Sequence, residues 1–178
     1  DRTHSTLLLL KYFGYYLTDE QFAVQLEWLL KYTRKWMKEK RLIFDFNDTI
    51  KSVFQSCCER IPSNKIAEFI ISLFNFKNYR LYDTACELIP FLKIKTLPVN
   101  IQRRIATHLV KLVTNKKACE NTFKLKNAIV IFALNTTIDI TLLENAVKMN
   151  METFYDGAYH LELYDKDKKS SLKQINTY

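Results

Sequence analysis

The sequence predicts an all-α protein, and three observations support this fold class. The 178 residues include only two glycines and three prolines, which leaves little material for the tight turns that a hairpin-rich sheet requires. Apolar residues recur at three- and four-residue steps along most of the chain, while the alternating pattern of half-buried strands is nearly absent. The segments between these periodic stretches are short. We therefore expect about eight or nine helices joined by short turns.

Capping signals and prolines locate the helices of the first half. The segment 18–21, Thr-Asp-Glu-Gln, has the form of a capping box and predicts a helix start. The apolar stripe of that helix comprises Phe22, Leu26, Leu29, Leu30, Trp36 and Met37. Asn47 or Asp48 can cap a second helix, which Pro62 stops. Ser63 is expected to cap the next helix, whose inward face carries Ile66, Phe69, Ile70 and Leu73.

The second half follows the same logic. A helix over 79–89 is expected to end or kink at Pro90. Thr96 is the expected cap of a helix running through 97–117, with Pro98 in its first turn, where a missing N–H is least costly. Further helices are predicted over about 121–134, from the cap Asp139 to residue 149, and over about 151–164.

The spacing of these units predicts a repeat architecture. Pro62 and Pro98 lie 36 positions apart, and Ile138 begins a comparable unit 40 positions later, which is the length expected of two-helix repeats. The segment KIAEFIISLFNFKNYRLYDTACELIPFL, followed by PVNIQRRIATHLVKLV, resembles consecutive helices of HEAT-type repeats over 63–149. The resemblance implies a HEAT-like stacked array that serves scaffolding or binding, and no catalytic residue carries over from it. A compact, non-repetitive helical bundle is the alternative architecture.

Domain organisation is expected to be simple. We predict one all-helical region over 1–165 and a polar C-terminal tail over 166–178. The four cysteines form no CxxC pair, so we interpret them as small core residues in a reducing compartment. The longest apolar run, LLLLKYFGYYL from Leu7, is short and contains Lys11, so no membrane span is expected. The chain opens with Asp1 and lacks a signal-peptide pattern; we expect a part of a larger cytoplasmic protein.

Charge is the most informative feature of the sequence. The segment 93–126 carries nine lysines and arginines and one acid, Glu120, whereas the rest of the chain is neutral. The whole formal net charge of +8 therefore comes from 34 consecutive residues. At about 100° per residue, one half of the helix after Pro98 is apolar and the other half gathers cations. The candidate contact residues are Arg103, Arg104, His108, Lys111, Lys116, Lys117, Lys124 and Lys126.

Three interpretations of this basic ridge stay open. Concentrated positive charge attracts nucleic-acid backbones, and it equally suits an acidic protein partner or another domain of the same protein. Alternatively, the cations solvate a helix face or contact acids within the chain. A second basic run, 31–41, interleaves Tyr32 and Trp36 with cations. Such aromatics can stack on exposed bases, although Trp36 also continues the apolar stripe and suits core packing.

Catalysis has little support in the sequence. The three histidines are scattered, no HExxH or Gly-rich nucleotide loop occurs, and we expect no metal or cofactor. The carboxylate pairs Glu59/Glu68 and Asp83/Glu87 are typical of helix surfaces. Some HEAT-like proteins act on alkylated DNA bases through an aromatic-lined cleft containing an acid, but Trp28 and Trp36 do not align with that arrangement. We therefore predict a non-catalytic scaffold or interaction module, with nucleic-acid binding as the alternative.

Overall fold

The computed structural model describes residues 2–38, 46–57, 59–76, 78–115 and 122–150, and every secondary-structure element in these ranges is helical. The α-helices are α1 (Arg2–Phe13), α2 (Asp19–Lys38), α3 (Phe46–Cys57), α4 (Ser63–Phe74), α5 (Tyr79–Leu88), α6 (Val99–Thr114), α7 (Thr122–Asn135) and α8 (Thr141–Met149). Three short 3-10 helices join them: η1 (Gly14–Tyr16), η2 (Ile89–Phe91) and η3 (Ile94–Thr96). The predicted all-α class is confirmed. The predicted helix over 151–164 and the tail lie outside the described residues.

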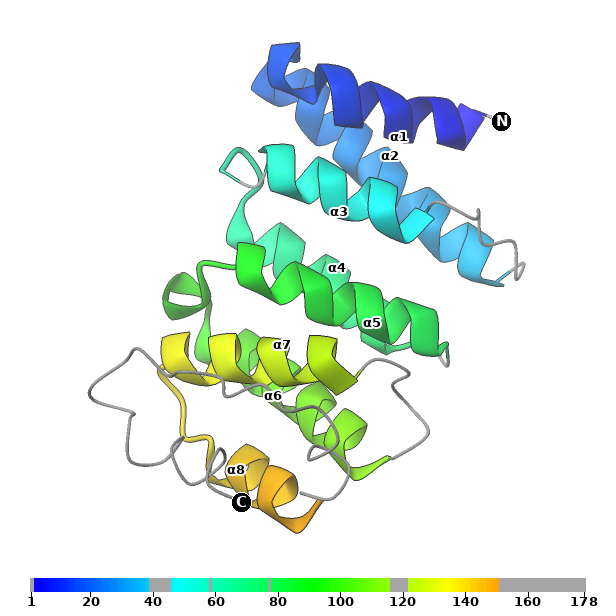
Figure 1. Ribbon diagram of the computed structural model, residues 1–178. Helices are drawn as coiled ribbons and strands as arrows, with labels where there is room; N and C mark the ends of the chain where they lie inside the picture. The colour runs from blue at the N-terminus through cyan, green and yellow to red at the C-terminus, as the bar shows by residue number, and fades with distance from the viewer. Residues whose placement is uncertain (1, 39–45, 58, 77, 116–121, 151–178) are drawn as a thin grey trace.

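Helices adjacent in the chain alternate between two layers. Helices α1, α3, α5 and α7 contact one another in series, and so do α4, α6 and α8. Contacts of α4 with α5 and of α6 with α7 join the two series, and α2 packs on α1. In Figure 1 the helices form a stack, with the blue α1 at one end and the orange α8 at the other. Within the described part of the chain, no helix is both long and apolar enough to cross a bilayer.

One start signal was assigned correctly, and a second was one residue away from the observed cap. The backbone N–H of Thr18 donates to Oε1 of Gln21 at 3.0 Å, and the N–H of Gln21 donates back to Oγ1 of Thr18 at 3.3 Å. This reciprocal pair is the predicted capping box, and α2 begins at the next residue, Asp19. The predicted cap Asp139 lies one residue before the N-cap position of α8, which Ile140 occupies, and its Oδ1 accepts the N–H and the hydroxyl of Thr141 at 2.9 and 2.6 Å. These bonds hold the pKa of the Asp139 carboxyl below its usual value.

Other predicted caps were wrong. Ser63 makes no capping bond to α4; its Oγ accepts the N–H of Lys93 at 3.2 Å and so joins the start of α4 to the α5–α6 connection. Thr96 lies in η3, and Pro98 occupies the N-cap position of α6 instead of its first turn. Asn47 lies inside α3, which begins at Phe46. Tertiary contacts and the fixed proline backbone thus replaced the side-chain caps.

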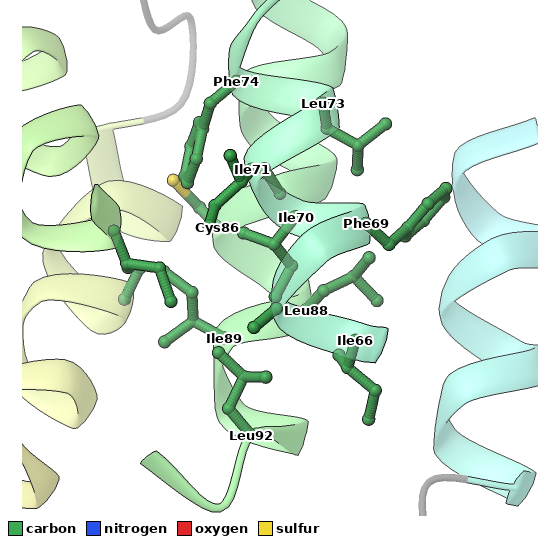
Figure 2. Close-up of a cluster of buried hydrophobic side chains, with 14 of the residues drawn as sticks. Ile66, Phe69, Ile70, Ile71, Leu73, Phe74, Cys86, Leu88, Ile89 and Leu92 are labelled. Carbon is green, nitrogen blue, oxygen red and sulfur yellow. The ribbon is translucent and has the colours of Figure 1, made fainter. Parts of the chain in front are cut away.

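The core runs through the middle of the stack, where α4 lies between neighbouring helices. The predicted inward residues of α4 are all buried, and so are Ile71 and Phe74, because α4 contacts both α5 and α6. Figure 2 shows Ile71 and Phe74 beside Cys86 of α5, whereas Phe69 points away from Cys86. The ring of Phe69 stacks on Phe54 of α3 with centroids 5.4 Å apart. Each such fully buried side chain contributes about 1.5–3 kcal/mol of hydrophobic stabilisation. The expectation of a core cysteine is confirmed for Cys86, which is buried.

A candidate anion-binding face on α6

The structure divides the predicted basic ridge between the two layers. Arg103, Arg104, His108 and Lys111 lie on α6, whereas Lys124 and Lys126 lie on α7. Lys116 and Lys117 lie outside the described residues. Helices α6 and α7 belong to different series of the stack and contact each other. The described cations therefore fall into two groups, one on each helix.

The α6 group faces solvent as the helical periodicity predicted. Arg103, Arg104 and Lys111 are exposed, while the opposite side of the helix packs into the core. Its buried apolar residues are Ile105, Leu109, Leu112 and Val113. No carboxylate occurs in α6, and among the described residues none forms a salt bridge with these three cations. We call Arg103, Arg104 and Lys111 the α6 cationic face.

His108 differs from its neighbours on α6 because it is half-buried. Its ring stacks on Phe74 of α4, with centroids 5.2 Å apart and planes 19° apart. Burial lowers the pKa of His108, and the nearby charges of Lys111 and Arg104 lower it further. The imidazole is therefore neutral at pH 7, and the α6 cationic face carries three permanent charges at that pH.

Lys124 belongs to an intramolecular ion cluster of three helices. Its Nζ lies 3.0 Å from Oε2 of Glu87 on α5, while Nζ of Lys51 on α3 lies 2.9 Å from Oε1 of the same carboxylate. Burial by itself raises the pKa of Glu87, but its bonds to the two ammonium groups outweigh that effect and hold the pKa below its ordinary value. Glu87 is therefore ionised at pH 7. The charge of Lys124 is compensated inside the protein. Contact with acids within the chain is one of the interpretations that the sequence analysis left open. Lys126 is half-buried on the same helix.

The second basic run is described only in part. Lys31 and Lys35 are exposed on α2. The Trp28 ring stacks on Tyr32 with centroids 4.0 Å apart, and Nζ of Lys35 lies 5.9 Å from the centroid of the Tyr32 ring. These aromatic rings are thus occupied by contacts within α2. The side chain of Trp36 and residues 39–41 lie outside the described part.

Sequence reasoning missed Arg60, which fastens the α1–α2 turn to the α3–α4 connection. Its guanidinium donates to the carbonyls of Gly14 and Leu17, each at 2.6 Å, and to Oδ1 of Asp19 at 2.7 Å. The same group lies 5.2 Å from the centroid of the Phe22 ring. A single arginine near a proline gives no periodic or motif signal, so only the folded chain reveals these partners.

Gln102 was also missed, although it lies on the same helix as the cations. Its Nε2 donates to the carbonyl of Leu97 at 2.8 Å and to Oγ1 of Thr137 at 3.1 Å. Its Oε1 accepts the Thr136 hydroxyl at 2.7 Å and the Thr137 N–H at 2.9 Å. The side chain is buried, and it joins the start of α6 to the α7–α8 connection.

An exposed apolar patch lies at the opposite end of the stack from α8. Its residues on α1 and η1 are Leu9, Tyr12, Phe13, Tyr15 and Tyr16, and we call them the N-terminal aromatic patch. The last four expose 59–80% of their surface. Large exposed apolar patches are typical of interaction sites, so this feature provides a second candidate surface.

The described residues hold no cluster of three or more His, Cys, Asp or Glu side chains that could bind a metal ion. Comparison of the chain with protein-family models, with curated proteins and with solved structures finds no match.

Proposed function

We propose that this chain is a non-catalytic, HEAT-like stacked helical scaffold of an intracellular protein, and that it binds an acidic protein surface or domain through the α6 cationic face. The alternation of consecutive helices between two layers supports the architecture, because each helix pair of such an array contacts its neighbours. The charge of Arg103, Arg104 and Lys111, with which no described residue forms a salt bridge, supports the anionic partner. It is the observation on which the proposal rests.

Internal neutralisation of Lys124 favours a protein partner over a nucleic acid. With Lys124 paired to Glu87, the α6 cationic face offers three positive charges on one helix. Three phosphate contacts give a salt slope of about −2.7 and a loss of about 40-fold in affinity between 50 and 200 mM salt. Such binding is weak and independent of sequence. Nucleic-acid binding is the second candidate, because a phosphate backbone presents the same anionic chemistry.

Fluorescence anisotropy with a labelled poly-glutamate peptide, and with labelled single- and double-stranded DNA and RNA, tests the proposal at two salt concentrations. The variant Arg103→Glu/Arg104→Glu is compared with Lys31→Glu/Lys35→Glu, whose sites are also exposed. Each double variant lowers the formal net charge from +8 by the same amount. We expect peptide binding that the α6 variant abolishes and the α2 variant retains.

Equal loss in the two variants would mean that net charge, and not the α6 cationic face, drives binding. Absence of peptide binding, together with salt-sensitive nucleic-acid binding that depends on Arg103 and Arg104, would select the second candidate. Absence of binding to every probe would refute both.

A further inference from the structure

The N-terminal aromatic patch has the geometry of a helix-packing face. Tyr12 and Phe13 lie three and four residues after Leu9 on α1, which places both beside Leu9 on one side of the helix. Their exposed fractions are 39%, 61% and 59%. Tyr15 and Tyr16 extend the patch onto η1, where their rings meet edge to face with centroids 5.8 Å apart.

Helices α3 and α5 each contact a neighbouring helix of the same layer on both sides, whereas α1 has such a neighbour on one side only among the described helices. Helix α3 contacts α1 and α5, and α5 contacts α3 and α7. Helix α1 packs on α2 and α3 and buries Leu10. In the described part of the chain, no other α-helix lies beyond α1 at that end (Figure 1). The patch therefore continues an established helix–helix layer.

The charge distribution permits two copies of the chain to meet at this end. Lys11 lies beside the patch with its Nζ 5.2 Å from the centroid of the Tyr12 ring, and the acids Asp19 and Glu20 follow η1 closely. One cation thus contacts the patch, and two acids lie three and four residues after Tyr16 in the chain, of which Asp19 is paired with Arg60. The net charge of the protein comes from 93–126, and α6 lies toward the other end of the stack (Figure 1). Two copies approaching by α1 avoid the repulsion that would oppose contact between their α6 faces.

We propose that two copies of this chain form a dimer in which their N-terminal aromatic patches pack against each other across a two-fold axis. A self-complementary patch of this kind gives a closed, isologous pair. The four aromatic side chains offer about 400–700 Å² of surface per copy. The resulting total of about 800–1,400 Å² reaches the lower part of the range of specific interfaces, roughly 1,200–2,000 Å². We expect a dissociation constant in the micromolar range.

Sedimentation equilibrium of the full chain over about 2–200 µM tests the dimer, because a micromolar constant places the transition inside that range. Tyr12→Ser/Phe13→Ser is expected to raise the dissociation constant about tenfold or more. Tyr15→Ser/Tyr16→Ser, on η1, is a second variant that leaves α1 unchanged. The matched control is Leu142→Ser/Met149→Ser on α8, where the exposed fractions are 79% and 85%; it is expected to dimerise like the parent.

Far-UV circular dichroism establishes that each variant is folded. Raising the NaCl concentration from about 50 to about 500 mM is expected to leave the dimer intact, because apolar contacts are not screened as charge contacts are. A chain that stays monomeric throughout the concentration range would overturn the proposal and assign the patch to a different partner. Dissociation caused by the α8 variant and not by the α1 and η1 variants would also overturn it.

Discussion

Replacing Gln102 with leucine tests whether one buried amide holds the α6 start against the α7–α8 connection. The substitution keeps the approximate volume and removes every hydrogen bond that the carboxamide makes. The bonds concerned join Nε2 to the Leu97 carbonyl at 2.8 Å and the Thr136 hydroxyl to Oε1 at 2.7 Å. Both partner residues are buried. Thr137 is exposed, so water can replace Gln102 as a partner of its N–H.

The expected loss of stability depends on which hydrogen-bond partners of Gln102 are buried and which are exposed. Loss of a typical hydrogen bond costs about 1 kcal/mol, and a buried polar group that loses its partner costs about 1–3 kcal/mol. The Leu97 carbonyl loses a buried donor, and the Thr136 hydroxyl loses one of its contacts. Less the gain from burying a leucine side chain, we expect the free energy of unfolding to fall by about 2–4 kcal/mol. For a chain of this size the melting temperature should fall by about 2–4 °C per kcal/mol, or roughly 4–16 °C.

Differential scanning calorimetry and urea denaturation monitored by circular dichroism measure the change. The matched control is Gln55→Leu, at an exposed glutamine of α3, where we expect a change within about 0.5 kcal/mol. If Gln102→Leu were as stable as the control, the hydrogen bonds around Gln102 would contribute no net stability, and the reasoning would be refuted.

Three further predictions concern ionisable side chains. Arg60→Met should lower the free energy of unfolding by about 2–4 kcal/mol in thermal melts, because two carbonyls lose a charged donor; Asp19→Asn should cost under about 0.5 kcal/mol, since Asp19 is 92% exposed. The stability that ionised Glu87 contributes is present above the ordinary carboxyl pKa of about 4.5 and is lost as the pH falls through its lowered folded value. Glu87→Gln should therefore be less stable at pH 7 by about 1 kcal/mol and show a shallower acid loss in urea melts. Burial of neutral His108 likewise stabilises the fold above about pH 6.5, and this stability is lost as the pH falls through the lowered pKa of the folded state. His108→Gln should therefore flatten the plot of unfolding free energy against pH between about pH 7 and pH 5. An unchanged slope would contradict the burial of the ring.

The helices could be predicted because burial imposes its period on the sequence. Ile66, Phe69, Ile70 and Leu73 were assigned to the inward face of α4 from their spacing alone, and all four are buried. Capping was predictable only where the partners are local. The Thr18 capping box spans three residues, whereas Ser63 bonds to Lys93, thirty residues away.

The candidate site was predictable within one helix and not between helices. The periodicity of α6 placed Arg103, Arg104 and Lys111 on a single exposed face. It could not assign Lys124 to an ion pair, because Glu87 lies on a different helix and the contact depends on how α5 and α7 pack. Polar groups with distant partners, such as Gln102, leave no periodic signal for the same reason.

The described cations of the two layers therefore differ in whether a carboxylate pairs with them. In the layer containing α3, α5 and α7, one carboxylate at Glu87 compensates lysines from both neighbouring helices. In the other layer, α6 contains no acid and directs its arginines and Lys111 outward. Charge that serves only to hold helices together is expected to be paired with opposite charge, since unpaired like charges repel. The arrangement on α6 offers no such gain in stability, which supports the binding role that we propose for this face.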